Sequence, residues 1–146
     1  MATHTPPHFF LLDGYALIYR AFFALITRPL RTGRGENTSA AWGVTNFLLR
    51  LREKYRPEYL VWVNDAGDSF RTQAYPEYKS TREKLDDELQ ADFDTAVERV
   101  RHLLAAFRIP LIEVEGYEAD DVIGTLALKG AAAGLKSVIV SGDKDF

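Results

Sequence analysis

The sequence predicts one α/β domain, a layered sheet of mainly parallel strands flanked by helices. Short, continuous apolar runs alternate along the chain with longer stretches of helical spacing, which is typical of this class. The length of 146 residues suits a single domain with its own core. No linker composition and no internal repeat interrupts the pattern, so we treat residues 1–146 as one unit.

Four apolar runs are expected to form the strands. Each is too short for a helix and is bounded by turn residues, as expected for a strand buried within a sheet. The runs are HFFLLD from residue 8, EYLVWV from residue 58, IPLIEV from residue 109 and KSVIVSGD from residue 136.

Four other segments have helical spacing. They cover residues 15–27, 40–55, 86–107 and a stretch that begins among the acids near residue 118 and ends at Gly134. Thr38 or Ser39 is expected to cap the second helix and Pro57 to end it, because the residue before a proline disfavours helix. The segment 70–84 is polar, basic and aromatic, and we expect it to be an ordered but mobile excursion from the sheet.

The composition excludes several classes of function. There is no cysteine, so a disulfide framework, a thiolate zinc site and a cysteine nucleophile are excluded, and any metal must be held by oxygen or histidine. No apolar run approaches the roughly 20 residues that cross a bilayer, so we expect a soluble, cytoplasmic protein that does not bind membranes. The net charge of −3 is unlike that of a strongly basic nucleic-acid binder.

Acidic residues follow three of the predicted strands, at Asp13, Asp65 and Asp143. Ligands bind beyond the carboxyl ends of strands in open α/β sheets, so these side chains are expected to meet the acidic start of the last helix at one edge. The expected cluster is Asp13, Asp65, Glu118, Asp120, Asp121, Asp143 and Asp145. Each acid taken singly has an ordinary explanation as a turn residue or a partner of a helix N-terminus.

So many carboxylates in one place would repel one another. Two unit charges 4 Å apart repel by about 1 kcal/mol in water and by about 4 kcal/mol at an effective dielectric constant of 20. Hard dications such as Mg2+ remove this repulsion, because they prefer oxygen ligands and also bind substrate phosphates. Two such ions about 3.5–4 Å apart can promote hydrolysis of a phosphodiester, so the cluster predicts a two-metal nuclease.

A nuclease must also hold a polyanion, and basic residues follow two of the predicted strand ends. They are Arg20, two helical turns beyond Asp13, and after Asp65 the residues Arg71, Lys79 and Arg82, interleaved with Phe70, Tyr75 and Tyr78. Cations bind phosphates and aromatic rings stack on bases. A purely solvated basic surface stays open as an alternative. Ser141 has no histidine placed to activate it, so serine chemistry has little support.

Five segments resemble a known family in order and spacing: LLDGYALIYRAFFAL, TSAAWGVTNFLLRL, FRTQAYPEYKSTR, EGYEADDVIGTLA and VSGDKDF. The family is the N-terminal 5′-to-3′ exonuclease domain of bacterial DNA polymerase I, a relative of the flap endonucleases. The resemblance runs from about residue 9 to the last residue, and the pair EGYEADD and SGDKD is its most specific part. It implies a Rossmann-like, PIN-like nuclease core.

The resemblance also implies roles for individual residues. The seven acids of the expected cluster would hold two Mg2+ or Mn2+ ions, and Arg20 and Lys79 would join them in catalysis. The implied contacts with DNA are Arg20, Arg71, Tyr78, Lys79 and Arg82. The implied activity is hydrolysis of DNA, and of RNA primers, near 5′ ends, nicks and flaps during replication and repair.

The resemblance predicts that the chain is the N-terminal part of such a catalytic domain, ending before a helix-hairpin-helix region. The whole protein is expected to be a monomer that can carry a polymerase domain. Two other functions stay open. One is a module that binds branched DNA or docks to a polymerase without cleaving. The other is an aspartyl-phosphate phosphotransferase, which is disfavoured because the motif at Asp13 lacks a second acid two residues later.

Overall fold

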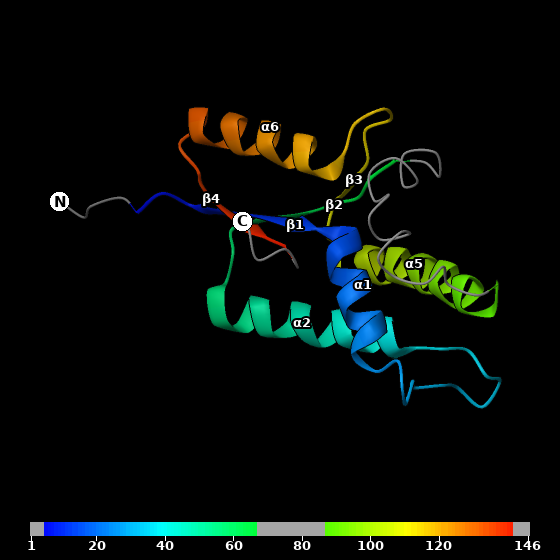
Figure 1. The fold of residues 1–146 in the computed structure, drawn as a ribbon. Helices are drawn as coiled ribbons and strands as arrows, with labels where there is room; N and C mark the ends of the chain where they lie inside the picture. Colours follow the sequence, from blue (N-terminus) through cyan, green and yellow to red (C-terminus); the bar gives the residue numbers. More distant parts are fainter. Residues whose placement is uncertain (1–4, 67–86, 142–146) are drawn as a thin grey trace.

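The computed structural model describes residues 5–66 and 87–141 and has the predicted α/β architecture (Figure 1). Its four strands are parallel and lie in the order β3-β2-β1-β4. Their bounds are β1 His8–Asp13, β2 Tyr59–Val63, β3 Leu111–Ile112 and β4 Lys136–Val140. The strands therefore all end at one edge of the sheet, called the carboxyl edge below, and all begin at the opposite, amino edge.

Helices cover both faces of this sheet. They are α1 (Gly14–Ala24), α2 (Ser39–Tyr55) and α5 (Asp87–Phe107) on one face and α6 (Ala119–Ala132) on the other (Figure 1). Side chains of a strand alternate between the two faces. Accordingly, Leu12 of β1 lies in the core under the first three helices, and Leu11 lies in the core under α6.

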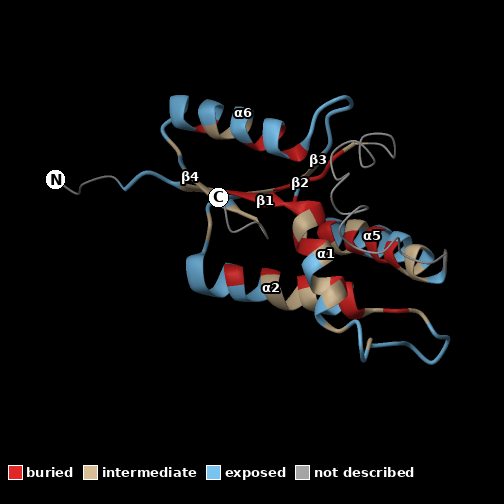
Figure 2. Cartoon of the chain, viewed as in Figure 1, coloured by how far each residue is buried: buried red, intermediate tan, exposed pale blue. Residues whose placement is uncertain are grey.

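The buried residues concentrate in β1, β2 and the sheet-facing sides of the helices (Figure 2). In the larger core, Trp62 of β2 is fully buried among residues such as Ile18 and Phe22 of α1 and Leu104 of α5. β1 is covered on both faces and paired on both sides, which explains why its apolar residues form a continuous run rather than an alternating one.

The third strand is shorter than predicted. Only Leu111 and Ile112 pair with β2, whereas the sequence predicted a strand over residues 109–114. Pro110 has no N–H to donate, although its carbonyl accepts the N–H of Trp62 at 2.9 Å. Beyond Ile112 the chain leaves the sheet and turns through Gly116, whose φ of +86° suits glycine.

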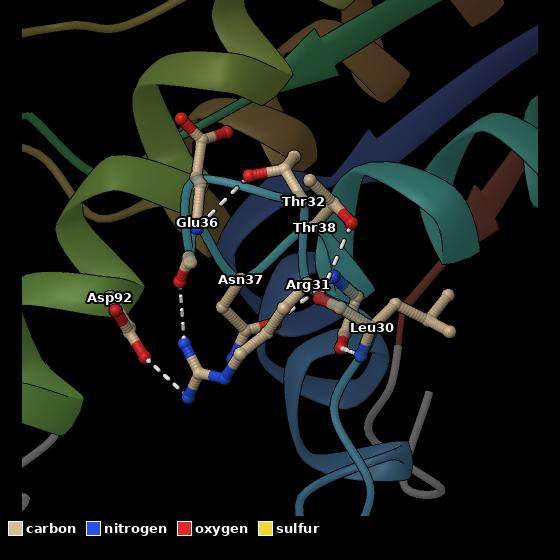
Figure 3. A network of polar contacts seen from close by, with 9 residues as sticks. Leu30, Arg31, Thr32, Glu36, Asn37, Thr38 and Asp92 are labelled. Atoms are coloured by element: carbon tan, nitrogen blue, oxygen red, sulfur yellow. Dashed lines mark hydrogen bonds and ion pairs between the residues drawn. The ribbon is translucent and has the colours of Figure 1, made fainter.

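The loop between α1 and α2 is held by side chains that the sequence assigned to a helix cap. Thr38 occupies the N-cap position of α2 but makes no capping hydrogen bond. Its hydroxyl donates instead to the carbonyl of Leu30, and Ser39 Oγ accepts the N–H of Leu30 at 2.9 Å. Arg31 of the same loop donates to Asp92 of α5 (Figure 3). The loop is therefore fastened to α5.

The other predicted helices are confirmed with ends shifted by a few residues. α5 begins at Asp87, and α6 ends at Ala132, just before the left-handed Gly134 with φ +84°. Within residues 5–66 and 87–141, no helix is long and apolar enough to cross a membrane. The predicted excursion at 70–84 and the predicted strand end from residue 142 onward lie outside the described residues.

Candidate active site at the carboxyl edge

Asp13 is the last residue of β1 and directly precedes α1. It is only 4% exposed, so its carboxylate lies almost entirely out of water. One oxygen, Oδ2, accepts a hydrogen bond from the hydroxyl of Ser141, just past β4, at 3.1 Å. The other oxygen, Oδ1, has no hydrogen-bond partner among the described residues. A buried carboxylate oxygen without a partner costs free energy, which makes it a candidate ligand atom.

Asp65 follows the end of β2 and is 2% exposed. Its Oδ1 accepts the N–H of Ala119, the first residue of α6, at 2.6 Å. This bond satisfies one of the free N–H groups of the helix N-terminus and fixes the acidic start of α6 at the carboxyl edge. The second oxygen, Oδ2, is buried without a hydrogen-bond partner in the described part of the chain.

The two buried aspartates and the acids of α6 repel one another. The pKa of Asp13 is raised from 3.8 to about 6, mainly by burial and further by Asp120 and Asp65, against the lowering effect of its hydroxyl partner. The pKa of Glu118 is raised as well, by the partial loss of water around its otherwise exposed carboxylate and by Asp121, with smaller effects of the same two aspartates. These mutual effects place five of the predicted acids in one electrostatic neighbourhood.

The structure brings the predicted cluster together only in part. Asp13 and Asp65 are buried, whereas the three acids at the start of α6 are exposed. In residues 5–66 and 87–141, no three acidic or histidine side chains form a group that could hold a metal ion. The remaining members of the predicted cluster lie outside the described residues: Asp143 and Asp145.

The residues present fit a hard divalent cation at this edge. In Asp13 and in Asp65, one oxygen is oriented by a protein donor and the other is buried with no hydrogen-bond partner in the described part. Ligand carboxylates in metal sites are commonly oriented in this way. The exposed acids of α6 add negative charge beside them. Mg2+ or Mn2+ accepts such oxygen donors and does not require a closed protein cage.

A tight contact between the residues next to the two aspartates, Gly14 and Asn64, was not predicted. The indole N–H of Trp62 donates to Asn64 Oδ1 at 3.0 Å, and both side chains are buried. They occupy the space of a Cβ at Gly14, which would lie 1.9 Å from Asn64 Oδ1 and 2.1 Å from Trp62 Nε1. Because Gly14 follows Asp13 and Asn64 precedes Asp65, this contact sets the spacing of the two backbones. The glycine directly after a strand-end aspartate was its only sequence signal.

Of the predicted DNA-contacting residues, Arg20 alone lies within the described parts of the chain. It is exposed on α1 and makes no ion pair with another described residue, which leaves its guanidinium accessible to an anion. Among the described residues, no contact ties Arg20 to the acids, so its role stays a prediction. The other predicted contacts lie outside the described residues: Arg71, Tyr78, Lys79 and Arg82.

Solved structures define the class to which this fold belongs. The T5 5′-exonuclease with bound zinc ions matches with a TM-score of 0.65 at 20% identity, over 94% of this chain and 50% of its own. The bacteriophage T5 flap endonuclease, in a pseudo-enzyme-product complex with DNA and metal ions, matches with a TM-score of 0.62 at 21% identity, over 94% and 49%. At these identities the likeness shows a shared fold, and the class is that of the 5′-nuclease fold.

The chain belongs to the family of the N-terminal, resolvase-like domain of 5′-3′ exonucleases, whose sequence model matches residues 8–146. DNA polymerase I of Chloroflexus aurantiacus is 45% identical over 139 residues, and that of Pseudomonas aeruginosa is 46% identical over 137 residues. A 5′-3′ exonuclease of Aquifex aeolicus is 42% identical over 138 residues. These matches confirm the family that the five sequence segments indicated.

The matches cover nearly all of this chain but only part of the relatives. They include 95% of the chain and 14% of the C. aurantiacus polymerase, 93% and 14% for P. aeruginosa, and 94% and 46% for the A. aeolicus exonuclease. The chain therefore spans less than half the length of these relatives. The activities of the whole relatives accordingly bear on this chain only as a proposal.

Proposed function

We propose that the chain is the N-terminal part of the catalytic domain of a metal-dependent 5′-3′ exonuclease. The proposed substrate is DNA near 5′ ends, nicks or flaps, together with RNA primers, and the bond cleaved is a phosphodiester. The observation that carries the proposal is the pair of buried aspartates at the carboxyl edge. Asp13 and Asp65 each keep one oxygen without a hydrogen-bond partner among the described residues, in a family of 5′-3′ exonucleases.

The proposed cofactor is Mg2+ or Mn2+, with two ions. Asp13 and Asp65 would hold them together with the acids of α6 and those that follow β4. The full proposed set is Asp13, Asp65, Glu118, Asp120, Asp121, Asp143 and Asp145. When bound, two such ions supply the positive charge that hydrolysis of a phosphodiester requires. Metal ions in the T5 nucleases, which share this fold, support a dication.

The protein's own residues would orient the ligands and hold the strand. Asp13 is held by the Ser141 hydroxyl and Asp65 by the first N–H of α6, so each carboxylate keeps one orientation. Without a cation, the acids of this edge would repel the phosphate at the cleaved bond, so that placing this one phosphate depends on metal. Binding of the rest of the strand would depend on the basic residues instead. Phosphate binding is proposed for Arg20, Arg71, Lys79 and Arg82, base stacking for Tyr78, and a place beside the cleaved bond for Arg20 and Lys79.

The relatives named DNA polymerase I support a larger setting for this domain. We propose that the chain is joined to a polymerase domain in a longer, monomeric protein, with a helix-hairpin-helix region between them. Such a protein would act on DNA in replication and repair in the cytoplasm. In such a protein, the residues that bind duplex DNA would lie both in this chain and in the helix-hairpin-helix region.

The direct test is cleavage of 5′-flap DNA by the longest natural chain that carries this sequence. Loss of a residue that only orients a metal ligand typically lowers activity about 10–100-fold. Asp13→Asn and Asp65→Asn remove proposed ligands, so each should lower magnesium-dependent cleavage by more than this. Binding of the same DNA should change little. Glu53→Gln, an exposed position on α2, is the matched control and should cleave normally. Undiminished cleavage by either aspartate variant would contradict the proposal.

A second candidate function is a module that binds branched DNA or docks to a polymerase without cleaving. The observation in its favour is that the described residues assemble no group of three metal-binding side chains. Magnesium titration separates the two functions, because a ligand that binds only the folded state raises its melting temperature as concentration rises. An unchanged melting temperature would favour the non-catalytic module.

A further inference from the structure

The amino edge of the sheet contains a pocket that the proposed nuclease chemistry does not use. Its volume of about 470 Å³ lies within the range of small-molecule sites. The ends of α2 and α5 and the start of β2 form its walls. In Figure 1, the amino edge is the side of the sheet where the chain passes from α2 into β2, and the start of α1 lies at the other end of the strands. The five residues of β2 separate the pocket from the carboxyl edge by roughly 16 Å.

Three arginines from two helix ends line this pocket. Arg52 is fixed, because its Nη2 donates to the carbonyl of Phe107 at 2.6 Å and its guanidinium lies 5.0 Å from the centre of the Phe107 ring. Arg56 and Arg108 are exposed and make no ion pair with any residue in the described ranges. Two guanidinium groups therefore face the pocket region without a carboxylate partner in the described part of the chain, and the third is already held in place.

The backbone of both of these arginines is in the left-handed region. Arg56 has a φ of 44° and Arg108 a φ of 60°, and both residues follow directly after a helix. Glycine adopts this conformation without a Cβ penalty and is the usual residue there. Arginine at both places thus costs strain, and strained positions that persist are often functional. A helix C-terminus does favour a cation, but that benefit does not require a left-handed arginine.

The acid that lines the pocket is engaged elsewhere. Glu58 Oε2 accepts the backbone N–H of His8 at 2.7 Å and lies 3.8 Å from His8 Nδ1. The hydrogen bond from His8 lowers the pKa of Glu58, so this carboxylate stays ionised and turned toward β1. Among the described residues, three arginines against one glutamate leave the pocket lining with a net charge of +2.

The charge and shape of the pocket indicate its ligand. A terminal phosphate carries about −1.5 to −2 charges at pH 7 and accepts the forked hydrogen bonds of guanidinium groups. A carboxylate or an internal phosphodiester carries one negative charge and matches the lining less well. Tyr59, 53% exposed at the start of β2, offers an aromatic face for a base. The apolar rings of Pro57 and Pro110 add contact surface beside it.

We propose that this pocket binds the terminal phosphate of a nucleotide, either a free nucleoside monophosphate or the phosphorylated end of a strand. The three arginines hold the phosphate, and Tyr59 contacts the attached nucleoside. The inference stands on the amino edge alone and holds whether or not the carboxyl edge cleaves DNA.

The test is a calorimetric titration of the chain with thymidine 5′-monophosphate in buffer containing a chelator, so that no metal at the carboxyl edge contributes. The double variant Arg56→Gly and Arg108→Gly removes two guanidinium groups while suiting the positive φ values. Its control, Arg28→Ala with Arg50→Ala, removes the same charge from exposed positions outside the pocket lining. We expect saturable binding that weakens at least about tenfold in the first variant, as expected for lost charge-assisted bonds, and little in the control.

A second variant keeps the test decisive if the glycine variant is poorly folded. Glu58→Gln keeps an oxygen for the His8 N–H but removes the negative charge, so affinity for the nucleotide should rise. Competition by a 5′-phosphorylated oligonucleotide, but not by its 5′-hydroxyl counterpart, would identify a strand end as the source. Competition by neither oligonucleotide would identify a free nucleotide. Equal weakening in the glycine and control variants, unchanged affinity in Glu58→Gln, or no saturable binding would overturn the proposal.

Discussion

The two edges of the sheet carry opposite charges that the described residues do not neutralise. At the carboxyl edge, Asp13 and Asp65 are buried, and each has one oxygen with no hydrogen-bond partner in the described part of the chain. At the amino edge, Arg56 and Arg108 stand beside a pocket with no ion-pair partner in the same ranges. The difference indicates two ligands of opposite sign, a cation at one end of β2 and a phosphate at the other.

The backbone shows the same contrast, and glycine substitutions sharpen it. Gly14→Ala would place a Cβ 1.9 Å from Asn64 Oδ1, so we expect a loss of about 3 kcal/mol in the free energy of unfolding. Arg56→Gly at the amino edge relieves the strain of a positive φ and should leave the free energy of unfolding within about 1 kcal/mol of the parent. Denaturant unfolding measures both changes.

The control for the Gly14 substitution is Gly124→Ala in α6, where an added Cβ meets nothing within 4 Å. Helix propensity there should make alanine neutral or stabilising by up to about 1 kcal/mol. If Gly14→Ala were as harmless as Gly124→Ala, the close packing of Gly14 against Asn64 and Trp62 would be contradicted.

The raised pKa of Asp13 predicts that the metal-free fold loses stability as pH rises. Its pKa is about 6 in the folded chain against an ordinary 3.8, so folding favours the protonated form. The stabilisation is fully present below pH 3.8 and is lost as pH rises through about 6. The pKa shift corresponds to up to about 3 kcal/mol.

Comparison with Asp13→Asn isolates this effect, because asparagine stays neutral at every pH. In a chelator, the variant should equal the parent at low pH and become the more stable protein above about pH 6. Unfolding curves collected across this range measure the difference. A stability difference that does not change with pH would show that Asp13 titrates normally.

A smaller pH-dependent change in stability is expected from an ion pair in which the chain supplies both charges. Arg99 of α5 donates three side-chain hydrogen bonds to Glu36 of the loop, and these lower the pKa of Glu36. The resulting stabilisation is present above the ordinary pKa of glutamate and is lost as pH falls through the lowered value, the opposite sign to Asp13. Because the pair is exposed, its contribution should be small and should shrink with added salt.

A double-mutant cycle with Glu36→Gln and Arg99→Gln measures the energy of this pair. The single variants should each destabilise slightly, and the double variant should destabilise less than the sum of the two. Strict additivity at low salt would show that the pair does not fasten the loop to α5.

The sequence was sufficient to locate the carboxyl edge. Apolar runs that alternate with helices define parallel strands, and residues that end such runs must share an edge, so Asp13 and Asp65 were placed correctly. The chemistry of the edge depends on contacts between distant segments and could not be read from the sequence. The bond from Ala119 to Asp65 joins residues 54 positions apart, and it decides which oxygen stays open.

The amino edge was not anticipated for a similar reason. Arg56 and Arg108 each read as an ordinary basic residue at the end of a helix. Their significance comes from α2 and α5 ending side by side at the start of β2, which is a property of the packed fold. The strained φ values and the engagement of Glu58 with His8 are likewise visible only in the structure.

Magnesium binding at the carboxyl edge is tested most directly by calorimetric titration of the metal-free chain above about pH 6, where Asp13 is ionised. Saturable binding is expected in the parent and in Glu53→Gln. Asp13→Asn should lose this binding. The absence of saturable binding in the parent, or equal binding in Asp13→Asn, would contradict a cation site at the carboxyl edge.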